Sequence, residues 1–279
     1  MNKSLPAGET LTMVKPKSGW ELIDFHELKQ YKDLIYFLVW RDIKVMYAQT
    51  ILGFFWAVLQ PLIQIVLFTV IFGKVAKVPT DDIPYVLFST VAIVPWTYMS
   101  TAMSQSSECL IRGQSMLGKV YFPRLIFPII SVLARLLDFF ISMLIILVVL
   151  LYYHVSPAWN LLCLPLFFVI MVMIPAGVGL WLSALAIRFR DVKYAMSYFL
   201  RLLIYTAPIV YSASSVPGKY RLLYSINPIV AVIEGYRSCL LGTPIPWGYV
   251  WPGVITSIIL LVSGALHFKR MEKIFVDVI

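Results

Sequence analysis

The side chains that could act as metal ligands, bases or nucleophiles are scattered through this sequence. The histidines and cysteines stand far apart, at His26, Cys109, His154, Cys163, Cys239 and His267. Metal-binding and disulfide motifs place such groups at short or regular spacings, and no such spacing occurs here. The sequence therefore predicts neither a metal site nor a catalytic centre built on these residues.

One short stretch comes close to a phosphate-binding loop. Gly113–Val120 reads GQSMLGKV, which has the glycines and the lysine of that loop at the right spacing. Val120, however, stands where the loop needs a serine or threonine to ligate Mg²⁺, and the stretch does not follow a predicted β-strand. We interpret the match as accidental and expect no ATP site in this chain.

The composition indicates a membrane protein. Hydrophobic residues make up 60% of the 279 residues and charged residues 13%, against roughly 45–50% and 25% in soluble domains. A single soluble core is therefore excluded. Basic loops on one side of a membrane explain the formal charge of +9. Since no basic run of the kind that tracks phosphates occurs, we expect no nucleic-acid partner.

Six apolar runs are long enough to cross a bilayer, which takes about 20 helical residues. They cover residues 51–73, 83–104, 125–153, 157–187, 194–213 and 249–268. Alternate loops hold 16 Lys and Arg residues on one side against 5 on the other. By the positive-inside rule both termini are cytoplasmic. We predict an all-α polytopic membrane protein with six transmembrane helices.

The connection between the fifth and sixth runs does not have the composition of a solvated loop. Residues 214–246 are apolar but are interrupted by Pro217, Pro228, Pro244 and Pro246. We expect a re-entrant helical hairpin in the outer leaflet, packed against protein or a water-filled cavity. The alternative is a complete seventh span, which would place the C-terminus outside, against the charge bias.

Residues 1–50 are predicted to form a cytoplasmic N-terminal segment before a transmembrane domain of residues 51–279. Within this segment, Leu28–Tyr47 spaces its apolar residues at helical intervals between basic ones. This pattern predicts an amphipathic helix that lies on the membrane surface and leads directly into the first span. The polar N-terminus also indicates that no signal peptide is cleaved.

Three residues of the Asp, Glu, Lys and Arg types fall within the predicted spans. Arg135 and Asp138 stand three apart on one helical face, where they can pair with each other or reach the nearby head groups. Arg201 lies deeper, and an unpaired charge at that depth is costly. We therefore expect Arg201 to pair with Asp138 or to line a pathway.

Three stretches of the sequence resemble one family of membrane proteins. The first is Trp40–Tyr47 (WRDIKVMY), which runs into Ala48–Leu62 without a linker; the others are Phe189–Val192, and Asn227–Pro228 with Glu234–Arg237. Together they resemble the permease subunit of ABC-2 type exporters of lipid-linked polysaccharides, the family that moves O-antigen, capsule and teichoic acid chains. The resemblance covers nearly the whole chain.

The resemblance implies a homodimer in the bacterial inner (plasma) membrane that exports a polyprenyl-pyrophosphate-linked glycan. Two copies of a separate ABC nucleotide-binding subunit would hold ATP and Mg²⁺, while this chain would bind no cofactor and catalyse no reaction. The segment after the second span would dock on that subunit. The candidate coupling residues are Glu108, Leu110, Ile111, Arg112 and Arg190. An ordinary solvated loop is the alternative for this segment.

Further roles follow from the same resemblance. Arg41 and Lys44 are candidate contacts for the lipid diphosphate at the entrance, and general membrane anchoring is the alternative. The candidate external gate comprises Asn227, Glu234 and Arg237. Aromatic rings offer sugars a tolerant apolar surface with polar tips. The candidate pathway residues are Phe54, Phe55, Trp56, Trp96, Tyr98, Arg201, Tyr205 and Tyr211. For each aromatic residue, packing or contact with lipid is the alternative.

Three other functions stay open. An ABC-2 exporter of small drugs or lipids would have less need of the long N-terminal helix. A membrane-embedded enzyme acting on lipid-linked sugars would need carboxylates or histidines clustered at one membrane face, whereas the acidic residues of this chain are dispersed. A secondary transporter would need an inverted repeat and deep carboxylates, which the sequence does not display.

Overall fold

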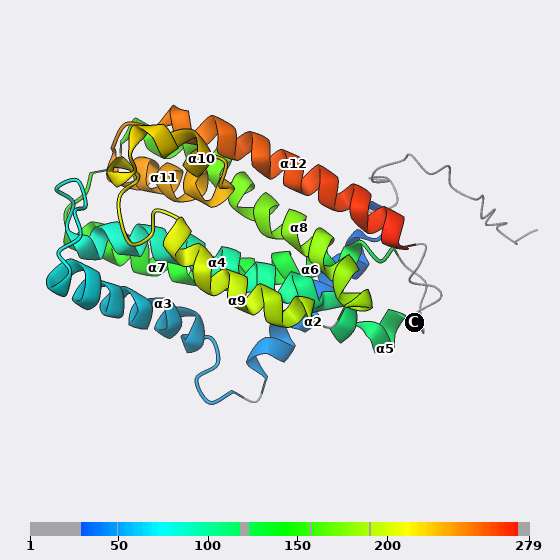
Figure 1. Cartoon of the computed structure of the whole chain (residues 1–279). Coiled ribbons are helices and arrows are strands. Elements are labelled where there is room, and N and C mark those ends of the chain that lie inside the picture. Colours follow the sequence, from blue (N-terminus) through cyan, green and yellow to red (C-terminus); the bar gives the residue numbers. More distant parts are fainter. Residues whose placement is uncertain (1–28, 49, 118–122, 157, 190, 273–279) are drawn as a thin grey trace, which may run out of the picture.

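The computed structural model describes residues 29–48, 50–117, 123–156, 158–189 and 191–272. Within these ranges every regular element is a helix, and the long helices form one bundle (Figure 1). The predicted all-α class is therefore confirmed.

Long helices alternate with short connecting ones along the chain. The elements are α2 (Lys32–Tyr47), α3 (Phe55–Phe68), the π-helix η1 (Thr69–Val75), α4 (Tyr85–Arg112), α5 (Gln114–Leu117), α6 (Ile126–Ala134), α7 (Leu136–Tyr152), the 3₁₀ helix η2 (Trp159–Cys163), α8 (Leu164–Arg188), α9 (Val192–Thr206), the 3₁₀ helices η3 (Ala213–Ser215) and η4 (Gly218–Tyr220), α10 (Arg221–Ser225), α11 (Pro228–Leu241) and α12 (Trp247–Glu272). Helix α2 matches the helix expected over residues 28–47, and η3 to α11 occupy the expected re-entrant segment.

Five helical segments of the described chain are long and apolar enough to cross a membrane. They are Phe55–Val75, Tyr85–Arg112, Ile126–Tyr152, Trp159–Arg188 and Trp247–Glu272. These segments coincide with the first four predicted runs and the last one. The chain is thus a multi-pass membrane protein.

The fifth predicted run, residues 194–213, forms a shorter helix than expected. Helix α9 ends at Thr206, and Ala207 takes extended backbone angles (φ −107°, ψ 155°). The next residue is Pro208, and proline disfavours helical backbone in the residue before it. The 15 residues of α9 extend over about 22 Å, which is less than a hydrocarbon core of about 30 Å. The count of six spans therefore stays a prediction.

Two other boundaries differ from the sequence-based ones. Helix α4 continues past residue 104 to Arg112, so the short helix expected after the second span forms the last turns of α4. The third run is divided at Arg135 into α6 and α7. The division places Arg135 and Asp138 together at the start of α7.

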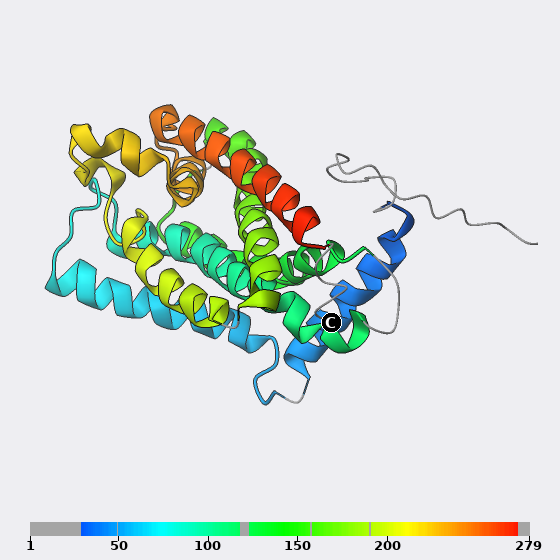
Figure 2. The ribbon, with the colours of Figure 1, turned by 45° about the vertical axis from the view of Figure 1, so that its right-hand side comes forward.

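Different helices lie at the two ends of the bundle. Helices α2 and α5 and the C-terminal end of α12 lie at one end, and α10 and α11 lie at the other (Figures 1 and 2). Helix α11 ends at Leu241 and is capped by Gly242, whose left-handed backbone (φ 72°) favours glycine. The chain then turns back into α12, against which α11 packs. This arrangement is consistent with a re-entrant hairpin at the end opposite to α2.

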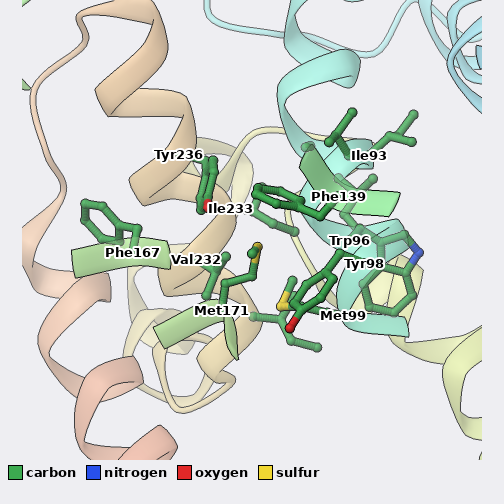
Figure 3. Close-up of a cluster of buried hydrophobic side chains, with 14 of the residues drawn as sticks. Ile93, Trp96, Tyr98, Met99, Phe139, Phe167, Met171, Val232, Ile233 and Tyr236 are labelled. Carbon is green, nitrogen blue, oxygen red and sulfur yellow. The ribbon is translucent and has the colours of Figure 1, made fainter. Parts of the chain in front are cut away.

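The main core lies where α4, α7, α8 and α11 meet (Figure 3). The ring of Phe139 lies 5.6 Å from that of Tyr98 and 6.2 Å from that of Tyr236, measured between centroids. Phe167 is fully buried beside them. A second core joins α2 to α6, α8 and α12 around the fully buried Leu38. Because α2 is packed by this second core, it is a fixed part of the bundle.

Helices α8 and α12 approach closely because both carry glycine at their contact. A Cβ atom built on Gly264 would lie 2.7 Å from the carbonyl oxygen of Gly177. A Cβ built on Gly177 would lie 2.9 Å from the backbone of Leu260 and Leu261. Backbone cannot move aside as a flexible side chain can, so the helix pair requires glycine at both positions. Small residues at such contacts are typical of membrane helix packing.

We expect Gly264→Ala to lower the stability of the protein by about 1–3 kcal/mol, the usual cost of overpacking a close contact. The measurement is the thermal unfolding midpoint of the purified protein in detergent. Gly248→Ala is the matched control in the same helix, because its Cβ meets no atom within 4 Å and alanine is the better helix former. Equal midpoints for Gly264→Ala and the wild type would contradict the expectation.

Candidate functional site

A cavity of about 660 Å³, widely open on one side, lies between α3, α4 and α9. Helix α3 contributes Gln64 and Phe68 to its lining, and α4 contributes the hydroxyl side chains of Ser100, Thr101 and Ser104. These three positions recur at helical intervals, so they share one face of α4. A cavity of this size that combines rings, hydroxyls and an amide can hold a small polar molecule or part of a polymer.

The hydroxyl groups on α4 are set up to accept hydrogen bonds from a ligand. Ser100 Oγ donates to the carbonyl oxygen of Thr97 at 3.1 Å, and Thr101 Oγ1 donates to the same oxygen at 2.7 Å. Each hydroxyl thereby uses its single hydrogen and keeps lone pairs on its oxygen. The α4 side of the cavity therefore offers acceptors to a ligand that carries hydroxyl donors.

Helix α9 adds a cation and a ring to the cavity. Arg201 and Tyr205 lie one helical turn apart and both line it. Among the residues that the structure describes, Arg201 makes no ion pair and no hydrogen bond. The expected pairing of Arg201 with Asp138 is wrong, because Asp138 is held by Arg135 on its own helix. The expectation that Arg201 lines a pathway stays a prediction, and the structure places it in a cavity.

The candidate pathway aromatics divide between the cavity and other places. Trp96 and Tyr98 both belong to the main core and are 4% and 2% exposed, but only Trp96 also lines the cavity. Two residues of a helix turn through about 200°, and Figure 3 shows the side chains of Trp96 and Tyr98 leaving α4 in different directions. Tyr98 therefore packs within this chain rather than facing the cavity.

The remaining aromatic candidates lie outside this cavity. Phe54 and Phe55 are about half exposed at the start of α3, and Trp56 lines a smaller cavity. Tyr211 donates a hydrogen bond to the carbonyl oxygen of Tyr205 at 3.2 Å. Tyr211 thus holds the segment after α9 against the cavity-lining end of that helix.

The smaller cavity, of about 190 Å³, lies where α2 leads into α3 and both meet α7. Tyr47 at the end of α2 donates a hydrogen bond to the Asp138 carboxylate. Arg135 Nη1 donates to the other oxygen of that carboxylate at 2.7 Å, so the expected local pairing of Arg135 with Asp138 is confirmed. The three side chains tie the end of α2 to the start of α7.

The candidate entrance residues lie on the last turns of α2. Arg41 forms an ion pair with Asp42 at 2.7 Å, and its side chain is 40% exposed. Lys44 is exposed, with its ammonium group 5.5 Å from the centre of the Trp40 ring. Both side chains can reach an anionic head group, and Lys44 does so without breaking an ion pair.

Two of the three candidate gate residues, Glu234 and Arg237, form a buried polar network at the end of the bundle that holds α10 and α11. Arg237 Nη1 donates to the Glu234 carboxylate at 2.5 Å, and Arg237 Nη2 donates to the carbonyl oxygen of Pro208 at 2.7 Å. The guanidinium also lies 3.7 Å from the centre of the Phe88 ring. Asn227 caps α11 by accepting from the amide of Ile229 at 3.1 Å.

A second set of hydrogen bonds holds the segment after α9 in place beside this network. Tyr85 donates to the carbonyl oxygen of Val210 at 3.0 Å, and Tyr249 donates to that of Ala213 at 3.2 Å. Burial raises the pKa of Tyr224, whose ring packs on that of Tyr249. The chain between α9 and α10 is thus fixed to α4, α11 and α12 at once.

The candidate coupling residues lie at the opposite end, on the last turn of α4. Leu110 is buried in the second core, whereas Ile111 and Arg112 are exposed. Glu108 lies 3.9 Å from both Arg112 and Lys193, measured between nitrogen and oxygen. The pair with Lys193 links the end of α4 to the start of α9. Arg190 lies outside the described residues.

Sequence reasoning missed the polar residues of the larger cavity. Gln64, Ser100, Thr101 and Ser104 were not singled out, because single hydroxyls and amides are common in membrane helices. The spacing of Ser100, Thr101 and Ser104, which places three hydroxyls on one face of α4, was the sequence signal that could have identified them. Sequence reasoning also missed Tyr47, since its partner Asp138 is 91 residues away in the chain.

A comparison with known protein families identifies the chain. The profile of the ABC-2 type transporter family matches residues 33–241. This range includes the larger cavity, the tether between α2 and α7 that Tyr47, Asp138 and Arg135 form, and the gate network of Glu234 and Arg237. The chain belongs to the ABC-2 type transporter family. The arrangement above therefore describes an ABC-2 transporter with a polar and aromatic cavity between α3, α4 and α9.

Relatives of this ABC-2 transporter carry names from polysaccharide export. An O-antigen export system permease protein, RfbA, of Klebsiella pneumoniae is 27% identical over 88% of this chain and 95% of its own length. The RfbA protein of Myxococcus xanthus is 25% identical over 90% of this chain and 97% of its own length. A polysialic acid transport protein, KpsM, of Escherichia coli is 24% identical over 83% and 91%, respectively.

Proposed function

We propose that this chain is the permease subunit of an ATP-driven exporter that carries lipid-linked polysaccharide from the cytoplasm across the bacterial inner membrane. The observation that carries the proposal is the cavity between α3, α4 and α9, because its rings, hydroxyl acceptors and amide suit sugar rings. The printed names of the relatives, which match this chain along nearly all of their length, support the same class of cargo.

In this proposal a separate ATP-hydrolysing subunit supplies the energy for transport. Two copies of an ABC nucleotide-binding subunit bind ATP and Mg²⁺ and dock at the end of the bundle that holds α5 and the last turn of α4. The ion pair between Glu108 and Lys193 then connects the docking end of α4 to α9. Since α9 lines the cavity, a displacement imposed on α4 reaches the cavity through the helix that carries Arg201 and Tyr205.

Two copies of this chain enclose the conduit in the proposed assembly, with all termini in the cytoplasm. The polyprenyl diphosphate of the cargo binds near Arg41 and Lys44 of α2, and the glycan follows through the cavity. It leaves past the segment held by Glu234 and Arg237. The tether of Tyr47, Asp138 and Arg135 supports this order, because it joins the entrance helix α2 to the transmembrane helix α7.

Depletion of this chain in its host tests the proposal. We expect lipid-linked glycan to accumulate on the cytoplasmic side of the inner membrane and to disappear from the cell surface, and re-expression to restore it. The readouts are lectin or antibody binding to intact cells and to lysed cells. The tagged chain should also co-purify with a soluble-type subunit that hydrolyses ATP.

Other outcomes would replace the proposal. Unchanged surface glycan together with increased sensitivity to small drugs would indicate a drug exporter of the same family. A chain that purifies alone, in a strain whose surface glycan is also unchanged by depletion, would rule out the permease role proposed here.

A further inference from the structure

Arg201 is the single charged residue among the described residues that line the larger cavity. It lies on α9 about 14 Å from Val192 along the helix axis. Neither an acidic side chain nor a carbonyl oxygen of the described chain pairs with it. Arg201 is exposed in this chain, whereas the less exposed Arg135 and Arg237 pair with Asp138 and Glu234, respectively. Arg201 differs from them in pointing at an open cavity.

The chemistry of the surrounding groups indicates what would satisfy this cation. A guanidinium stays protonated at any physiological pH and offers its donors in a planar fork. A cation at membrane depth is costly unless it faces water or an anion. A carboxylate or phosphate matches the fork with two parallel hydrogen bonds, whereas a neutral hydroxyl leaves the charge uncompensated.

The rest of the lining suits a sugar that bears such an anion. Ser100 and Thr101 have already given their hydrogens to a backbone carbonyl, so their oxygens accept from sugar hydroxyls. Phe68 and Tyr205 supply rings for the apolar faces of a sugar, and the largely buried Trp96 borders the same space. The cavity thus holds a complete set of partners for an acidic sugar: acceptors, ring faces and one cation.

We propose that Arg201 is an anion subsite that favours glycans carrying acidic sugars, and that it recognises their carboxylate groups as the polymer passes. This inference rests on the proposed export function and specifies the chemistry of its cargo. The diphosphate of a lipid carrier is the other source of anionic oxygen. A single arginine matches one carboxylate better than a diphosphate with its several charges, and α2 already offers Arg41 and Lys44 for the diphosphate.

A binding experiment tests the subsite. The transporter, purified with its ATPase partner in lipid nanodiscs, is titrated with oligosaccharides that contain glucuronic acid. The same oligosaccharides after reduction of each carboxylate to an alcohol provide the neutral comparison. We expect the wild type to bind the acidic form about tenfold more tightly or better, as one charge-assisted pair provides. Added salt should weaken that preference.

Variants assign the preference to one side chain. Arg201→Gln should bind both forms equally, and Arg201→Lys should retain part of the preference because it keeps the charge. Lys219→Gln removes a positive charge from the exposed surface outside the cavity, so it should behave as the wild type. A preference that survives Arg201→Gln, or a wild type that binds both forms equally or neither, would overturn the subsite.

A third ligand separates the two sources of anion. Polyprenyl diphosphate without a glycan is used as a competitor of the acidic oligosaccharide. If Arg201→Gln abolishes the binding of polyprenyl diphosphate and leaves glucuronate binding intact, the subsite belongs to the lipid head group and our assignment fails. The export measurement in cells is independent of these titrations. Normal export with no acidic preference would refute the subsite alone, and loss of the subsite therefore leaves the proposed function standing.

Discussion

Arg237→Leu is expected to give a protein that unfolds far more easily than the wild type, with a loss of about 3–5 kcal/mol. Arg237 is 4% exposed and Glu234 is 8% exposed. Leucine would leave the Glu234 carboxylate without its partner and the carbonyl oxygen of Pro208 without its donor. A buried ionised group that loses its partner is among the most destabilising changes known for a folded protein.

The thermal unfolding midpoint in detergent measures this effect, and two other variants calibrate it. Arg221→Gln alters an exposed arginine in the same region, whose Nε donates to the Tyr249 hydroxyl at 3.1 Å; its midpoint should fall by only a few degrees. The double change Glu234→Gln with Arg237→Gln should be milder than Arg237→Leu, because no buried charge remains. If Arg237→Leu alone unfolded at the same temperature as the wild type, the ion pair of Glu234 with Arg237 would be dispensable for stability.

Arg237 also joins α11 to the segment that follows α9. Arg237 on α11 holds Pro208, which lies just beyond the end of α9, and α9 lines the cavity through Arg201 and Tyr205. Any displacement of α9 toward the outer end therefore pulls on a buried ion pair of α11. Of the two ends of α9, the outer one is held by this network, and the inner one is linked to α4 by the more exposed ion pair of Lys193 with Glu108.

The sequence was sufficient for the positions of the long helices, because hydrophobic runs are decided by local composition. The main exception was α9, where Pro208 ends the helix earlier than the apolar run does. The break at Arg135 was also missed, although the local pair with Asp138 was predicted from their spacing. Both exceptions concern backbone geometry within an apolar run, where hydropathy carries no information about helix ends.

The cavity could not be predicted from the sequence because it depends on which helix faces are left uncovered. Trp96 and Tyr98 are both aromatic and lie on one helix, yet only Trp96 lines the cavity. Helix α4 packs against several other helices, so the hydroxyls that cluster on one of its faces do not by themselves show which of its faces borders a cavity. Arg201 was recognisable as a costly charge, but its surroundings come from α3 and α4.

Ser100→Trp is expected to reduce export by about tenfold or more, since each 1.4 kcal/mol added to a barrier slows passage tenfold. Ser100 lies on the α4 wall of the cavity, opposite α9. An indole in place of the hydroxyl would project into the space that we assign to the glycan. The rate to compare is the appearance of glycan on the surface of cells that express equal amounts of each variant.

Controls separate obstruction from misfolding in this experiment. Ser100→Ala keeps the cavity open and removes one of several hydroxyl acceptors on α4, so its export should fall far less than that of Ser100→Trp. Leu144→Trp places the same indole on an exposed position of α7 outside the cavity, and should also export. Because Ser100→Trp changes the interior of the cavity rather than the docking end of α4, the partner should still co-purify and hydrolyse ATP. If Ser100→Trp exports at the wild-type rate while remaining folded, the glycan does not pass between α3, α4 and α9, and the conduit must be formed by other surfaces of the chain.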